Sequence, residues 1–133
     1  MYRPIISALL GVCVILLAAW LGLAALLGAH PSWEVQVALI GAPIGALLAM
    51  LLGWLERGRT AFFAGLIFAA VGLPLAMRGK AAFDASYAED QLAGVFWYYG
   101  WVAIFIGVTL ALSVLISRAS GPAGRLSAPP PLG

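Results

Sequence analysis

Four long runs of apolar residues dominate the hydropathy pattern of this chain, and charged residues are confined to the segments outside them. None of the runs contains Asp, Glu, Lys, Arg or His, and they cover residues 5–28, 35–55, 61–77 and 92–117. Each run is long enough to cross a hydrocarbon core of about 30 Å. Because a backbone in lipid must satisfy its own hydrogen bonds, each run should be helical. The pattern therefore predicts an all-α fold, a four-helix transmembrane bundle.

The composition agrees with a membrane protein. Hydrophobic residues make up 64% of the 133 residues and charged residues only 9%, whereas soluble domains have about 25% charged residues. A soluble domain of this size buries only about two-thirds of the surface of its unfolded chain, so it could not hide this much apolar surface.

Local signals at the ends of the runs predict the helix boundaries. Ser32 is the expected N-cap of the second helix, with Glu34 near the positive end of its dipole. Residues 86–89, Ser-Tyr-Ala-Glu, match a capping box, so the fourth helix is expected to begin at Tyr87 and project into water. The predicted helices cover about 5–28, 33–55, 60–77 and 87–117 in a membrane domain of residues 1–119. Residues 120–133, rich in Pro and Gly, are predicted to form a flexible tail.

Charge predicts the orientation. Five arginines fall on one predicted side of the membrane: Arg3, Arg57, Arg59, Arg118 and Arg125. With Glu56 that side carries a net charge of +4. The other side has two bases and four acids, a net charge of −2, and the two sides sum to the +2 of the chain. The positive-inside rule then places both termini in the cytoplasm, N-in and C-in.

Small residues recur at helical spacing and predict close contacts between helices. The clearest positions are Gly41, Gly45, Ala49 and Gly53 in the second helix, and Gly100 and Gly107 in the fourth. Small residues let helix backbones approach in lipid, where van der Waals packing drives association. The sequence leaves two alternatives open: packing inside the bundle, or an interface with another protein.

Pro43 lies near the middle of the second helix. A proline there removes one backbone N–H and predicts a kink. The kink is either a fixed packing feature or a hinge whose exposed carbonyl lines a polar path.

Aromatic residues cluster where the fourth helix should enter the outer leaflet. They are Phe96, Trp97, Tyr98, Tyr99 and Trp101. Trp and Tyr favour the membrane interface, so the cluster predicts an aromatic belt in contact with lipid. The alternative is a binding surface for a quinone, a carotenoid or a partner protein. His30, the one histidine of the chain, is expected to be a solvated loop residue.

The absence of charge within the runs argues against several functions. Ion-coupled transporters usually bind their ion at an ionisable residue inside the membrane. The chain resembles the small multidrug resistance transporters in size and in number of helices, but it lacks the acidic residue that they carry in their first helix. Ser7, Thr109 and Ser113 are the non-aromatic hydroxyls well inside the runs, and no base accompanies them. We therefore expect no catalytic site, metal or cofactor, and no nucleic-acid partner.

The sequence favours a non-catalytic small subunit, or an assembly or accessory factor, of a larger membrane complex. Its partners would be membrane lipids and larger membrane-protein subunits in a bacterial inner membrane, with a respiratory or photosynthetic complex as the expected type. The alternative is a homo-oligomeric pore or carrier for a small uncharged solute. An enzyme that works only with residues donated by a partner is a third hypothesis.

Overall fold

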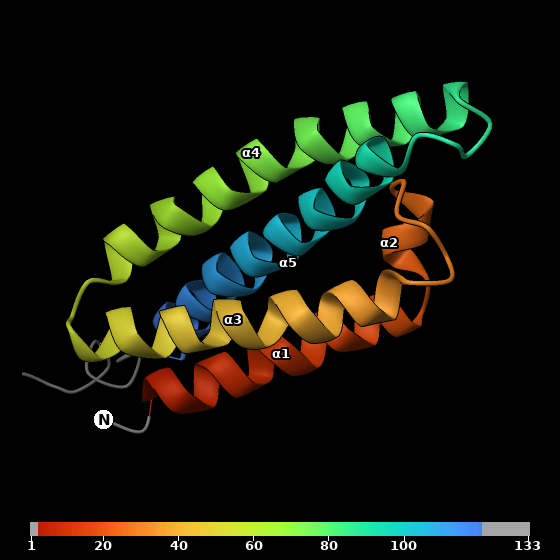
Figure 1. Cartoon of the computed structure of the whole chain (residues 1–133). Helices are drawn as coiled ribbons and strands as arrows, with labels where there is room; N and C mark the ends of the chain where they lie inside the picture. The colour runs from red at the N-terminus through yellow and green to blue at the C-terminus, as the bar shows by residue number, and fades with distance from the viewer. Residues whose placement is uncertain (1–2, 121–133) are drawn as a thin grey trace, which may run out of the picture.

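The structure, a computed structural model, describes residues 3–120 and is all-helical over that range, with no strand (Figure 1). Its helices are α1 (Arg3–Trp20), α2 (Leu23–Leu26), α3 (Glu34–Trp54), α4 (Gly58–Ala85) and α5 (Gln91–Ala119). All except α2 are long and apolar enough to cross a membrane, by length and composition. The prediction of an all-helical chain with four long apolar helices is thereby confirmed. Of the predicted tail, residues 121–133 lie outside the described residues.

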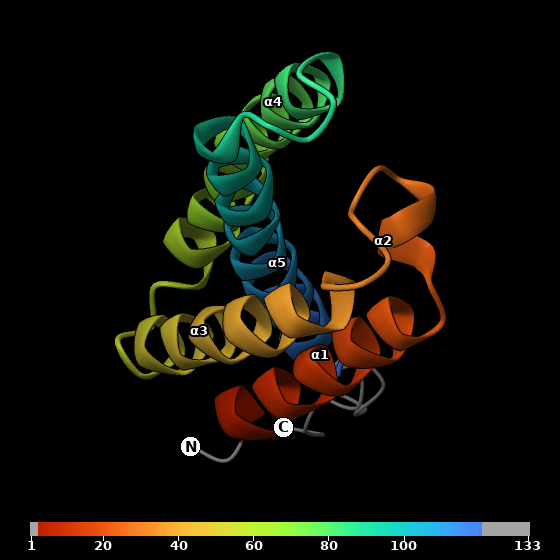
Figure 2. The same cartoon turned by 45° about the vertical axis from the view of Figure 1, so that its right-hand side comes forward.

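Helix α5 occupies the centre of the fold. It packs against α1, α3 and α4, and it is the most buried of the four long helices. Helices α1 and α3 pair with each other on one side of α5, whereas α4 lies along the other side (Figures 1 and 2). Because α4 makes few contacts with α3, it is held to the rest of the protein mainly through α5.

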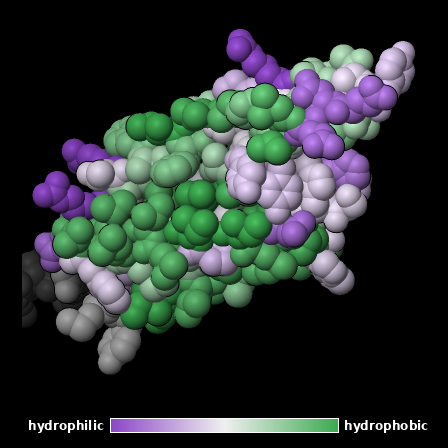
Figure 3. All heavy atoms as spheres, in the orientation of Figure 1, coloured by the Kyte–Doolittle hydropathy of each residue, from purple (hydrophilic) through white to green (hydrophobic). Residues whose placement is uncertain are grey.

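The surface divides into an apolar band and two polar ends. In Figure 3 hydrophobic residues cover most of the visible face, and hydrophilic residues gather at its two extremities. We call one extremity the basic end, defined by Arg3, Arg57, Arg59 and Arg118. The other, the far end, contains the segment 27–33 and the turn 86–90 between α4 and α5. Large apolar side chains between the two ends are widely exposed, as they would be on a lipid-facing surface.

The first predicted helix is shorter than expected. A continuous helix over 5–28 was predicted, but α1 ends at Trp20 and Gly22 adopts a left-handed conformation with φ of 84°. Glycine tolerates this conformation because it has no Cβ, and it commonly ends helices in this way. The short helix α2 then turns away from the axis of α1 (Figure 1).

The side chain of Glu34 stabilises this break. Its carboxylate accepts a hydrogen bond of 2.7 Å from the backbone N–H of Ala25, in the first turn of α2. Glu34 is buried and lies in the first turn of α3, near the positive end of the helix dipole as predicted. Ser32 is not the N-cap of α3: Trp33 takes that position without a side-chain cap, and the Ser32 hydroxyl contacts Nδ1 of His30 instead.

The boundary between the last two long helices also differs from the prediction. Helix α4 was expected to end at residue 77, yet it continues for two more turns to Ala85. Helix α5 begins at Gln91 rather than at Tyr87, and Asp90 is its N-cap, accepting a bond from the N–H of Ala93. Tyr87 has a positive φ and belongs to the turn. The end of the apolar run marks where hydropathy changes, not where the helix stops.

Candidate functional site

Glycine residues bring helices α4 and α5 into close contact. Gly65, Gly72 and Gly79 recur every seven residues on α4, and each faces a backbone carbonyl of α5, at Gly107, Gly100 and Ala93 respectively. A Cβ on Gly72 would lie 2.7 Å from the carbonyl oxygen of Gly100. The two antiparallel backbones therefore meet closely along a seam made mainly of glycine and alanine residues.

A second seam joins α3 to α5. A Cβ on Gly41 would lie 2.6 Å from Cβ of Phe105, and one on Gly45 would lie 2.5 Å from the carbonyl oxygen of Ile106. Ala49 is buried with Leu110 in the same region.

Further along α3, Gly53 faces Pro4 of α1. The structure thus places all six predicted packing residues between helices of this chain: Gly41, Gly45, Ala49, Gly53, Gly100 and Gly107. A surface for a partner has to lie elsewhere.

Pro43 lies inside α3, which continues through it. Its side chain is exposed, and so is Leu39, whose carbonyl loses its usual amide partner to the proline. The neighbours Gly41, Ala42 and Gly45 face the core instead. The free carbonyl is therefore on the outside of the bundle, away from any path through its core.

The aromatic cluster of α5 divides between the interior and the surface. Phe96 and Tyr99 are exposed and Tyr98 is half-buried, in keeping with a surface belt. Trp97 and Trp101, however, are each only 5% exposed. The prediction that all five face lipid or a partner is corrected for these two residues, because a helix presents residues four apart on one face and that face packs against the core.

Trp97 connects the elements of the far end. Its indole N–H donates a 3.0 Å hydrogen bond to the carbonyl oxygen of Gly28. Its ring contacts those of His30, Trp33 and Phe83, with centroids 5.2–5.6 Å apart. His30 is thus half-buried in an aromatic cluster rather than solvated.

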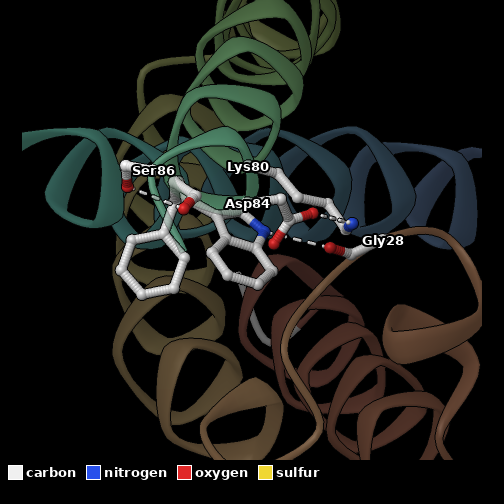
Figure 4. A network of polar contacts seen from close by, with 6 residues as sticks. Gly28, Lys80, Asp84 and Ser86 are labelled. Atoms are coloured by element: carbon white, nitrogen blue, oxygen red, sulfur yellow. Dashed lines mark hydrogen bonds and ion pairs between the residues drawn. The ribbon is translucent and has the colours of Figure 1, made fainter. Parts of the chain in front are cut away.

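The extra turns of α4 reach the same cluster. Nζ of Lys80 lies 5.6 Å from the ring centroid of Trp97 and forms an ion pair of 2.8 Å with Asp84. Figure 4 shows Lys80 and Asp84 close to Gly28, with Ser86 on the other side of the network. This arrangement joins α4, α5 and the segment before α3 at the far end.

A cleft of about 330 Å³ opens beside this cluster, between the end of α2 and α4. Leu27 lies on one wall, Leu73 and Met77 on the other, and Trp101 contributes to the lining from α5. Lys80 and Asp84 supply its charged groups. The cleft exists because α4 is held mainly by α5 and makes few contacts with α3. Its mainly apolar walls suit a hydrocarbon chain or an apolar helix face.

A larger cavity of about 490 Å³ lies at the basic end, among the ends of α1, α3, α4 and α5. Two exposed arginines, Arg3 and Arg118, line it together with Glu56. Ser7 and Ser113, both buried, and Ser117 add hydroxyl groups. Ser7 and Ser113 were predicted to be hydroxyls without a base. Helices α1 and α5 bring them into one cavity with two arginines, which the sequence pattern does not report.

A stripe of hydroxyls on α5 leads inward from this cavity. Thr109, Ser113 and Ser117 are spaced four residues apart, so they lie on one face. The Ser113 hydroxyl donates a 2.7 Å bond to the carbonyl of Thr109, whose own Oγ1 is buried with no hydrogen-bond partner among the described residues. Leu110, the residue after Thr109, and Val37 of α3 are fully buried.

Over residues 3–120, no group of three or more His, Cys, Asp or Glu side chains lies where it could hold a metal ion. No protein-family model matches the chain, and neither the curated proteins nor the solved structures give a significant match to it.

Proposed function

We propose that this chain is a non-catalytic accessory or assembly subunit of a larger membrane complex, inserted through four helices with both termini in the cytoplasm. The bacterial inner membrane is the proposed location, and a respiratory or photosynthetic complex the proposed type. The observation that carries the proposal is the far-end cleft, an apolar recess at the side of the bundle between α4 and the end of α2.

The attachment of α4 supports this role. One face of α4 is held by the glycine seam on α5, while Leu73 and Met77 remain exposed on the wall of the cleft. A recess with mainly apolar walls can receive the side of a neighbouring helix, or a lipid or quinone tail held between two proteins. The rigid aromatic cluster around Trp97 fixes the edge of this recess.

The alternative, a homo-oligomeric pore or carrier for a small uncharged solute, has less support. Val37 and Leu110 fill the centre of the bundle, and the carbonyl freed by Pro43 faces outward. A solute path would therefore have to run between chains, along surfaces that expose mainly Leu, Ile, Val and Phe.

Purification from native membranes in a mild detergent tests the proposal. The wild-type chain is expected to elute in fixed ratio with larger subunits. Met77→Trp fills the cleft and should remove those subunits, while Ile67→Trp is the matched control. Ile67 is on the same helix with the same exposure, 63% against 62% for Met77, and it does not line the cleft.

Two outcomes contradict the proposal. One is a homogeneous small oligomer of this chain alone, which favours the pore or carrier. The other is equal loss of subunits from Met77→Trp and Ile67→Trp, which places the interface outside the cleft.

A further inference from the structure

The basic-end cavity contains two cationic side chains that form no ion pair with any residue of the range 3–120. Within residues 3–120 the ion pair formed is that of Lys80 and Asp84 at the far end, so no carboxylate lies within 4 Å of the guanidinium groups of Arg3 or Arg118. Both arginines nevertheless line one cavity, approaching it from the start of α1 and the last turn of α5. A guanidinium group presents a planar fork of N–H donors that matches two oxygens of a phosphate.

The start of α4 adds backbone donors to this cavity. Gly58 lines it, the helix has no side-chain N-cap, and no atom lies within 4 Å of where a Cβ of Gly58 would be. The first N–H groups of a helix have no partner within the helix and attract anions. The free N–H groups of this first turn therefore lie next to the wall that Gly58 contributes to the cavity.

The net charge of the cavity lining favours a phosphate group of matching charge. Two arginines and the one carboxylate of Glu56 give the lining a net charge of +1. This balances a phosphate diester, which carries one negative charge, better than a phosphate monoester, which carries nearly two at neutral pH. Glu56 and the Ser113 oxygen, whose hydrogen is given to Thr109, are acceptors for hydroxyl groups on the same ligand.

We propose that the basic-end cavity binds the phosphate diester headgroup of an anionic phospholipid bearing free hydroxyls. Arg3 and Arg118 hold the phosphate oxygens, the start of α4 adds N–H donors, and Glu56 accepts from the headgroup hydroxyls. A volume of about 490 Å³ accommodates a phosphate with its glycerol. Basic pockets between membrane helices on the cytoplasmic side commonly bind anionic headgroups. The site rests on the proposed insertion in a membrane, but it lies at the opposite end from the far-end cleft and does not depend on a partner subunit.

The full chain reconstituted in phosphatidylcholine nanodiscs, with or without phosphatidylglycerol, tests this site. We expect phosphatidylglycerol to raise the unfolding temperature, and native mass spectrometry to detect one phosphatidylglycerol retained per chain. Arg3→Gln with Arg118→Gln should weaken retention at least tenfold, because both charge-assisted contacts to the phosphate are lost. Circular dichroism verifies that this variant is folded.

The matched control is Arg57→Gln with Arg59→Gln, which removes the same charge from the same end without touching the cavity lining. It should retain the lipid as the wild type does. If both double variants lose phosphatidylglycerol equally, the effect is one of surface charge and the proposed site is wrong. The site is also wrong if the wild type retains no phosphatidylglycerol. If glycerol phosphate in solution stabilises the protein as much as phosphatidylglycerol does, the ligand is a soluble phosphate ester and the lipid assignment is wrong.

Discussion

The indole N–H of Trp97 donates a 3.0 Å hydrogen bond to the carbonyl oxygen of Gly28, which lies 69 residues earlier in the chain. Gly28 has a φ of 117° and belongs to the irregular segment between α2 and α3. Such a segment has few backbone partners of its own, so a bond from the central helix α5 fixes its position. The ring of Trp97 adds contacts to Trp33 on the same segment.

Trp97→Phe should therefore destabilise the protein by about 1–3 kcal/mol, because it leaves the Gly28 carbonyl without its donor. The measurement is reversible unfolding in mixed detergent micelles, followed by far-ultraviolet circular dichroism. Tyr99→Phe is the control, since Tyr99 is 61% exposed on the same helix. Similar midpoints for wild type and Trp97→Phe would mean that the bond contributes nothing.

The glycine seams predict which glycines tolerate a methyl group. Gly107→Ala and Gly45→Ala should each cost about 1–3 kcal/mol, because the new Cβ meets backbone atoms of α4 or α5 that cannot move aside alone. Gly58→Ala is the matched control: its Cβ meets nothing within 4 Å, and alanine favours the helix. Its unfolding midpoint should equal or exceed that of the wild type. A loss at Gly58 as large as at Gly107 would contradict this account.

The hydropathy pattern and the spacing of small residues predicted much of the fold. Apolar runs indicate long helices, and regularly spaced small residues indicate the faces that pack against other helices. Gly41 and Gly45 could be recognised from their spacing, and the structure places both against α5. Gly79 belongs to the same pattern as Gly65 and Gly72. It was missed because Arg78 and Lys80 end the apolar run, whereas helix α4 continues through them.

The rest depends on contacts between distant segments, which composition does not report. Trp97 and Trp101 look like interface residues by type, yet both face the core. Glu34 looks like a first-turn acid of α3, and its partner is an N–H of α2. The basic-end cavity is lined by both Arg3 and Arg118, which come from opposite ends of the described chain.

Glu34 also supports a local prediction. Glu34→Ala removes the acceptor for the Ala25 N–H, so the first turn of α2 should open more often. Amide hydrogen exchange over residues 23–27 should become about fivefold to thirtyfold faster, as expected for a loss of about 1–2 kcal/mol at a helix cap. Glu34→Gln retains an acceptor oxygen and should exchange more slowly than Glu34→Ala. Glu89→Ala, at an exposed position in the far-end turn, should leave this segment unchanged.

The predicted orientation rests on the arginines of the basic end and can be tested without a partner or a ligand. A reporter that is active only in the cytoplasm, fused after Gly133, should be active, because Arg3, Arg57, Arg59 and Arg118 all mark that side. The same reporter inserted between Tyr87 and Ala88, in the turn at the far end, should be inactive. An export-dependent reporter at both positions should give the reverse pattern. Activity of the cytoplasmic reporter in the turn would invert the topology, and with it the leaflet that faces the basic-end cavity.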